Sequence, residues 1–320
     1  MRRRILLMSS EDNIHAAFEP FTEVAEIVTI PPDRDAFKKA IRDVDACFSS
    51  MSIRLDREIL QEAKQLRVIA TASTGLDHID CKVAEEMGVT IISLKEEIEF
   101  LNDITATAEM AWTLMLAVFR KLPSAFDWVK LGHWRAPGGR YRGHQISGKT
   151  LGILGYGRLG SMMADYGKAF RMRVIACDTK EINPPSGVSM VDFETLIAES
   201  DVLTIHIHLT EKNHNLISRT EFQKMKPGTV LVNTSRGAII DETAFLEALE
   251  TNHLGGAGID VIDGEWNDDF TGHPLIRYAN THENLVISPH IGGVTYESQQ
   301  MAITFIVNKL MLFLQDLDYN

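Results

Sequence analysis

The sequence has little cysteine, no long apolar run and no excess of positive charge. Its three cysteines, Cys47, Cys81 and Cys177, are too few and too scattered for a disulfide framework or a zinc site, which favours a reducing compartment. No stretch approaches the roughly 18 apolar residues that a membrane-spanning helix needs. Lys and Arg number 32 against 44 Asp and Glu, so no global basic field attracts nucleic acid or an anionic membrane. We expect a cytoplasmic protein that binds neither.

The length of 320 residues favours two domains of roughly 150 residues each, with a cleft where they meet. In the first hundred residues, short apolar runs rich in β-branched residues alternate with amphipathic stretches. This alternation predicts a parallel sheet covered by helices. The expected strands are Ile5–Met8, Glu26–Thr29, Ala46–Phe48, Val68–Ala70 and Thr90–Ile92.

A helix is expected from Asn102 to Leu122, where apolar residues keep helical spacing until Pro123 stops it. It is long enough to connect two domains. Residues 123–149 are rich in turn formers and carry Trp128 and Trp134. These tryptophans indicate either an exposed segment with an interface role or ordinary core packing. The first reading gives a homodimer formed through the domain that contains residues 123–149.

A second alternating series begins at Thr150 and predicts a complete dinucleotide-binding unit. The last residues, from about Gly292 to Leu314, have the pattern of a helix that could return to cover the first sheet. We therefore expect one domain from residues 1–101 and 293–320, and a second from 102–292. The strands expected in the second domain are Thr150–Leu154, Arg173–Asp178, Val202–His206, Thr229–Asn233, Ala257–Asp260 and Leu285–Ser288.

A glycine hexad, Gly155 to Gly160, follows the first of these strands and precedes a helical run. In this context Gly155 allows a tight turn, Gly157 lets the backbone approach a pyrophosphate, and Gly160 lets helix and strand pack closely. Asp178 ends the next strand, where a carboxylate accepts hydrogen bonds from the adenosine ribose and repels a 2′-phosphate. The pattern predicts an NAD site and disfavours NADP.

Three polar segments follow later strands of the same predicted sheet: Asn233–Gly237, Asp260–Glu265 and Ser288–Gly293. The carboxyl ends of parallel strands share one edge, where ligands bind in open α/β folds. We therefore expect an arginine, a glutamate and a histidine to meet in one cleft.

These segments, in this order, resemble the D-isomer-specific 2-hydroxyacid dehydrogenase family. The resemblance extends into the first half at Ser73–Asp80 and Thr107–Glu109. It implies two doubly wound α/β domains, with a Rossmann NAD-binding domain inserted into a flavodoxin-like substrate domain. Its nearest activities are phosphoglycerate dehydrogenase and hydroxypyruvate or glyoxylate reductase. Since the sequence ends at Asn320, no additional C-terminal regulatory domain is expected.

The resemblance also implies site residues for the transfer of a hydride between NAD and a small 2-hydroxy or 2-keto acid. Arg236 would bind and polarise the substrate, His290 would act as general acid and base, and Glu265 would pair with the imidazole. The substrate would contact Ser73, Thr74, Gly75, Arg236 and His290. The cofactor would contact Thr107, Gly155, Gly157, Arg158, Leu159, Gly160, Asp178, His206, Thr210, Thr234, Arg236, Asp260, His290 and Gly293.

Two residues depart from the family pattern. Trp266 follows the catalytic glutamate where the family commonly has proline, so the loop carrying Glu265 could take another path. His208 replaces another proline, which could loosen a turn that faces the cofactor.

Two alternatives remain open at this point. His206 and His208 lie on one face of a strand, as metal ligands can, but no third ligand lies nearby and no metal is expected. An NAD-responsive binding protein of the corepressor kind would keep the same fold without turnover. The sequence does not identify the substrate's side chain.

Overall fold

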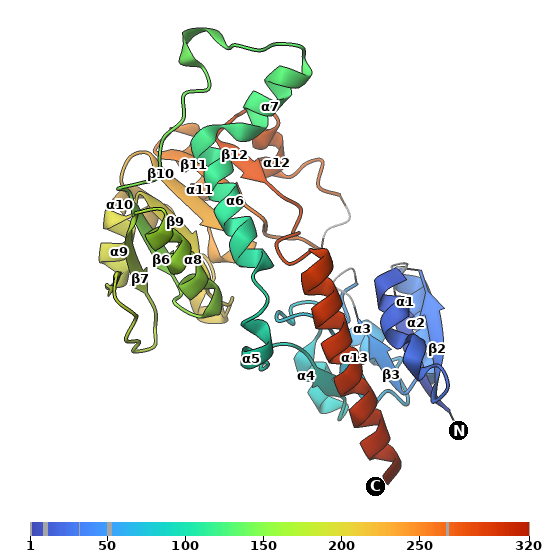
Figure 1. Cartoon of the computed structure of the whole chain (residues 1–320). Coiled ribbons are helices and arrows are strands. Elements are labelled where there is room, and N and C mark those ends of the chain that lie inside the picture. The colour runs from blue at the N-terminus through green and yellow to red at the C-terminus, as the bar shows by residue number, and fades with distance from the viewer. Residues whose placement is uncertain (1, 9–11, 32, 50–52, 267–268, 320) are drawn as a thin grey trace. The chain divides into compact units, whose positions relative to one another are not determined.

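The computed structural model describes residues 2–8, 12–31, 33–49, 53–266 and 269–319 (Figure 1). The chain divides into two compact units. The first unit is Met1–Ile104 with Val294–Asn320, and the second unit is Thr105–Gly293. Among the described helices, none is both long and apolar enough to cross a membrane.

The first unit is built on a five-stranded parallel sheet in the order β2-β1-β3-β4-β5. This is the strand order of flavodoxin-like doubly wound sheets. The apolar strands are buried because helices cover both faces of the sheet. The strands are β1 (Arg3–Met8), β2 (Ala25–Ile30), β3 (Ala46–Phe48), β4 (Val68–Ala70) and β5 (Thr90–Ile92).

The C-terminal helix α13 (Tyr296–Tyr319) belongs to the first unit and packs with α1 (Asp12–Phe18) on one face of its sheet. Ile306 and Leu310 of α13 are fully buried there. The opposite face is covered by α2 (Arg34–Ala40), α3 (Arg57–Leu60) and α4 (Cys81–Glu86), and α5 (Ile98–Leu101) follows the last strand.

The second unit contains seven parallel strands in the order β12-β11-β10-β9-β6-β7-β8. The strand order reverses between β6 and β9, which is the switch point where doubly wound sheets bind nucleotides. β8 was not predicted, because it has only three residues and its middle residue, Ser189, is polar and exposed. The strands are β6 (Thr150–Leu154), β7 (Arg173–Cys177), β8 (Val188–Met190), β9 (Val202–Ile205), β10 (Thr229–Asn233), β11 (Leu254–Ile259) and β12 (Leu285–Ile287).

Two apolar cores lie on the two faces of this sheet. One face is covered by α6 (Ala106–Arg120) and α8 (Arg158–Ala169). The other is covered by α9 (Phe193–Glu199), α10 (Arg219–Lys224), α11 (Glu242–Glu250) and α12 (Pro274–Ala279).

The helix expected over 102–122 is shorter in the structure than its apolar sequence pattern predicts. Leu101 and Ile104 are buried in the core of the first unit, and α6 begins only at Ala106. Lys121, with a φ of 51°, ends α6 in the left-handed region. Pro123 then lies in the first turn of another helix, α7 (Leu122–Lys130), where its missing N–H removes no hydrogen bond. The proline thus starts a helix as well as following one.

Candidate active site

Arg236, Glu265 and His290 lie in three loops that follow neighbouring strands of the second unit. β10, β11 and β12 are adjacent and parallel, so the loops after them share one edge of the sheet. Arg236 and Glu265 both act electrostatically on the imidazole of His290. The structure therefore brings together the three residues that the sequence predicted to meet.

The imidazole of His290 is hydrogen-bonded to the carboxylate of Glu265, with Nδ1 2.5 Å from Oε2. The two side chains are 31% and 22% exposed, so the contact is partly shielded from water. The hydrogen bond to Glu265 is the main reason that the pKa of His290 is raised. Burial and the positive charge of Arg236 oppose this shift without cancelling it. The arrangement favours an imidazolium as a proton donor.

The turn that carries His290 is built around the buried carboxylate of Asp260. This carboxylate accepts hydrogen bonds from Ser288 Oγ at 2.5 Å and from the N–H groups of Ile291 at 3.0 Å and Gly292 at 2.6 Å. His290 itself has a φ of 53°, in the left-handed region, and its N–H donates to the Asp260 carbonyl at 2.9 Å. Asp260, expected to contact cofactor, thus holds the His290 turn in shape.

The backbone at Arg236 is held by Asn233, a fully buried residue at the start of the predicted polar segment, for which the sequence indicated no role of its own. Its Oδ1 accepts from the Ser235 N–H at 3.0 Å, and its Nδ2 donates to the Arg236 carbonyl at 2.9 Å. The guanidinium of Arg236 donates to the Ser235 carbonyl at 2.6 Å. A buried amide satisfied in this way fixes the loop because breaking either bond would leave a buried polar group unpaired.

Gly237 brings the Arg236 loop against the loop that carries Glu265. A Cβ at this position would lie 2.0 Å from the carbonyl carbon of Ile262 and 2.2 Å from the N of Asp263, so only glycine fits. The Ile262 N–H in turn donates to Glu265 Oε1 at 3.3 Å. Although Trp266 replaces a proline, the loop brings Glu265 to His290, and the expected change of path does not separate the pair.

The glycine hexad forms the turn from β6 into α8. Gly155 has a φ of 94°, and a Cβ there would lie 2.5 Å from the His206 carbonyl oxygen. A Cβ on Gly160 would lie 2.1 Å from the Gly155 carbonyl oxygen, so this glycine allows the close helix–strand packing. Gly157, by contrast, faces open space: nothing lies within 4 Å of its Cβ position. It precedes α8, whose first N–H groups have no side-chain cap and suit an anion.

Asp178 follows the carboxyl end of β7, one residue beyond the strand. Its Oδ2 accepts from the Tyr156 N–H at 2.8 Å and its Oδ1 from the Lys180 N–H at 2.9 Å. The carboxylate is therefore fixed beside the glycine turn, where a ribose of the cofactor would lie.

Two buried polar atoms near the switch point have no hydrogen-bond partner among the described residues. They are Nδ1 of His206 and Oγ1 of Thr234, which follow β9 and β10. The other ring nitrogen of His206 contacts Thr204 Oγ1 at 2.8 Å, and burial lowers the pKa of His206 to about 4, so the ring is neutral. Unsatisfied buried groups are rare in proteins. Together with the open space at Gly157, they fit a bound dinucleotide.

The other residues expected at the cofactor are Thr107, Arg158, Leu159 and Thr210, and their side chains have different surroundings. Thr107 lies beside the Gly293 backbone, with Oγ1 3.8 Å from the position of a Cβ there. Arg158 begins α8, and burial lowers its pKa. Leu159 packs against the apolar core, and the Thr210 side chain caps a short turn ending at Asn213.

The turn after β9 is closed by Asn213. Its Nδ2 donates to the His208 carbonyl at 2.7 Å, and its Oδ1 accepts from the Thr210 N–H at 2.6 Å. The amide thus fixes the turn that the missing proline was expected to loosen. No group of three metal-ligating side chains occurs in the part of the chain that the structure describes.

In the first unit, the expected substrate residues lie in the loop after β4. The Ser73 hydroxyl donates to the Gly75 carbonyl at 2.8 Å, and the Ser73 carbonyl accepts from the Leu94 N–H at 3.0 Å. These bonds hold the backbone of Ser73–Gly75 in a tight turn at the carboxyl edge of that sheet.

Comparison with known proteins identifies the family to which the chain belongs. The family model for the NAD binding domain of D-isomer specific 2-hydroxyacid dehydrogenases matches residues 112–292. A glyoxylate reductase from Thermococcus litoralis is 33% identical over 290 residues, covering 88% of this chain and 84% of that protein. A hydroxypyruvate reductase from Thermotoga maritima is 33% identical over 288 residues, covering 90% of each.

The fold is likewise shared with a solved structure. A glyoxylate reductase from Paecilomyes thermophila superposes with a TM-score of 0.82 at 30% identity, covering 97% of this chain and 94% of that one. Fold, motif order and sequence identity thus agree over most of the chain. The chain belongs to the D-isomer-specific 2-hydroxyacid dehydrogenases, oxidoreductases that use NAD.

Proposed function

We propose that this protein reduces small 2-keto acids to D-2-hydroxy acids, and catalyses the reverse oxidation, at Arg236, Glu265 and His290. The observation that carries this proposal is the 2.5 Å contact between His290 and Glu265, with Arg236 acting on the same imidazole. Reduction of an anionic ketone needs a cation for the substrate and a proton donor for its oxygen. Relatives that act on glyoxylate and hydroxypyruvate support substrates of this size.

Arg236 binds the substrate carboxylate and polarises the ketone. Its planar fork of donors suits a carboxylate, and its backbone is fixed by Asn233.

His290 donates a proton to the ketone oxygen during reduction and removes it during oxidation. Bound NADH would supply the hydride that the carbonyl carbon needs. Since Nδ1 is held by Glu265, the proton is exchanged at Nε2. The raised pKa favours the protonated form of the imidazole, which is the form that donates the proton. Glu265 orients the ring and stabilises the imidazolium.

The cofactor is proposed to lie across the switch point, with its pyrophosphate at Gly157 and the start of α8. Asp178 would hold the adenosine ribose, and its fixed negative charge would disfavour a 2′-phosphate. NADH should therefore be used in preference to NADPH.

Oxidation of NADH by a panel of 2-keto acids tests the proposed function. The panel comprises glyoxylate, hydroxypyruvate, pyruvate, branched 2-keto acids and 3-phosphohydroxypyruvate, each also measured with NADPH. We expect turnover with at least one small 2-keto acid and a higher kcat/KM with NADH. Binding of NADH without turnover on any member would contradict the proposal and favour an NAD-responsive binding protein.

The arm that follows α6 supports a second proposal, that the protein forms a homodimer through its cofactor domain. Figure 1 shows α7 and the segment after it extending away from the rest of the second unit. α7 has no buried residue, and Phe126, Leu131 and Trp134 are 61%, 74% and 80% exposed. The alternative in which Trp134 packs in the core is wrong. Exposed apolar side chains grouped in this way mark an interface, and a second copy of this chain is the proposed partner.

A further inference from the structure

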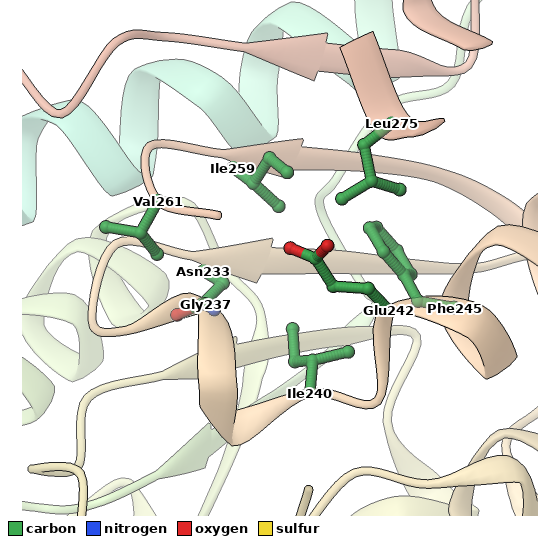
Figure 2. Close-up of a pocket in the computed structure, with 8 residues that line it drawn as sticks. All are labelled: Asn233, Gly237, Ile240, Glu242, Phe245, Ile259, Val261 and Leu275. Carbon is green, nitrogen blue, oxygen red and sulfur yellow. The ribbon is translucent and has the colours of Figure 1, made fainter. Parts of the chain in front are cut away.

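The acidic side chain of Glu242, in the second unit, points towards the sheet next to the loop that carries Glu265. Glu242 is the first residue of α11, and Figure 2 shows its carboxylate directed towards β10 and β11, between Ile259 and Phe245. The cavity that it enters has a volume of about 10 Å³. That is at the lower limit for one water molecule and far below the roughly 300 Å³ of a small-molecule site. Glu242 therefore contacts protein groups and not a ligand.

The Glu242 carboxylate contacts both ends of the loop between β11 and α12. Oε1 accepts from the Asp263 N–H at 2.7 Å, near the beginning of the loop. Oε2 lies 3.3 Å from Nε2 of His273, the residue that precedes α12. His273 and Glu242 are 11% and 22% exposed, so this is a shielded contact. One side chain thus holds two points, ten positions apart in sequence, between which Glu265 lies.

The contact with Asp263 reaches Glu265 through the backbone. The neighbouring N–H, that of Ile262, donates to Glu265 Oε1, while the other carboxylate oxygen contacts His290. Gly237, in the loop that carries Arg236, packs closely against the same Ile262–Asp263 peptide. A shift of this peptide would therefore move the Glu265 carboxylate relative to the imidazole.

The groups around Glu242 act on its pKa in opposite directions. Burial raises its pKa, as do the negative charges of Asp263 and Glu265, whereas the Asp263 N–H and His273 favour the ionised form. The charged groups that act most strongly on the pKa of His290 are Glu265, Arg236 and Asp260. We expect Glu242 to act on His290 mainly through the position of Glu265.

We propose that Glu242, with His273, is a positioning residue of this active site, which fixes the loop from Ile262 to Glu265 so that the Glu265 carboxylate meets His290. The proposal rests on the proposed role of His290 only for its catalytic consequence. The position of Glu265 against His290 can be measured without substrate.

The test compares the His290 imidazole in four proteins by NMR titration of ¹⁵N-histidine-labelled enzyme, with His290→Gln assigning the resonance. Glu242→Leu keeps the apolar volume of the side chain but removes the acceptor, and Glu242→Ala serves if leucine prevents folding. Glu242→Gln keeps an oxygen that can accept from the Asp263 N–H and a polar group beside His273. The matched control is Glu247→Gln, on the exposed side of the same helix, where the glutamate pairs with Arg219.

We expect Glu242→Leu to lower the pKa of His290 by about half a unit or more, because the imidazolium loses a well-placed carboxylate. In Glu242→Gln the pKa of His290 should stay close to that of the native protein, and Glu247→Gln should not change it. The descending limb of kcat/KM for keto acid reduction should move by the same amount, with little change in NADH affinity. An unchanged His290 pKa in folded Glu242→Leu, or equal effects of Leu and Gln, would overturn the proposal. Absence of turnover with an intact NMR shift would contradict only the proposed function.

Discussion

The acid–base chemistry proposed for this site depends on how strongly the Glu265 carboxylate holds a proton on His290. Because the folded-state pKa of His290 is raised, the imidazolium persists to a higher pH than in an unperturbed histidine. Reduction, which consumes that proton, should slow as the pH rises through the raised pKa. The same contact also stabilises the fold. Its contribution is complete when the pH is below the pKa of the histidine in the unfolded chain, and it is lost as the pH rises through the pKa of His290 in the folded protein.

Glu265→Gln tests this dependence. The amide has no charge with which to stabilise the imidazolium, so the descending limb of kcat/KM for reduction should move to lower pH. Rates should fall most at neutral and higher pH. The pH profile of kcat/KM with saturating NADH measures the shift. An unmoved limb would show that Glu265 does not set the pKa of His290.

His290→Gln removes the proton donor while keeping a polar side chain of similar size. General acid–base catalysis contributes about 10²- to 10⁴-fold, so turnover should fall by about that factor. The Kd for NADH, measured by fluorescence titration, should change little, because the imidazole acts mainly on the substrate. If turnover stayed within a few-fold of the native enzyme, the assignment of His290 would be wrong.

At the scale of elements, the turn between β6 and α8 combines a rigid frame with one open position. Gly155 and Gly160 are enclosed by backbone, whereas the Cβ position of Gly157 has no neighbour within 4 Å. The fold alone therefore requires glycine at two of these positions and leaves the third for a ligand. A methyl group added at Gly157 should therefore affect cofactor binding, whereas one added at Gly155 or Gly160 should affect folding.

Gly157→Ala should leave the melting temperature of the cofactor-free protein almost unchanged and raise the Kd for NADH about tenfold or more, because the methyl group occupies the space proposed for the pyrophosphate. Gly272→Ala is the matched control, since its Cβ position is also open and its φ is not positive. Equal NADH affinity in both variants would place the pyrophosphate elsewhere.

At the scale of the whole molecule, the arm formed by α7 and the segment that follows it leaves several large apolar side chains exposed. Its apolar side chains border a hollow of about 540 Å³ lined by residues that include Trp128, Val129 and Trp134. Arg140 at the end of the arm lies 5.5 Å from the Trp128 ring and pairs with Glu283 at 2.8 Å. The arm is thus anchored to its own unit while its apolar side chains remain exposed.

Trp134→Glu combined with Leu131→Glu should convert a dimer into a monomer, because two charges would be buried without partners at the interface. Light scattering after size exclusion should give twice the chain mass of 35.8 kDa for the native protein and a single chain mass for the variant. Ile98→Glu, which changes an exposed apolar residue of α5, should leave the mass unchanged. A monomeric native protein would contradict the proposal.

The strands could be predicted from sequence because nearly all are apolar, β-branched and covered on both faces, a pattern that depends on local residue type. β8 could not, since Ser189 interrupts a three-residue edge strand. The start of α6 was misplaced because its pattern extends through Ile104, which tertiary packing assigns to the first unit.

The same distinction applies to the site. Arg236, Glu265 and His290 could be found because their residue types carry the chemistry and each follows a strand. Asn233 and Glu242 could not, because their roles depend on burial and on backbone partners brought close by the fold. A polar residue near the end of a strand or the start of a helix does not by itself show which N–H group it will meet.

The left-handed backbone of His290 has a consequence for how this protein can change. An L-residue in that conformation costs about 1–2 kcal/mol relative to glycine, and the Asp260 network holds it there. At this position thermal stability therefore favours glycine, whereas the proposed proton transfer needs histidine. A descendant of this protein in which that activity was no longer needed would gain thermal stability by replacing His290 with glycine.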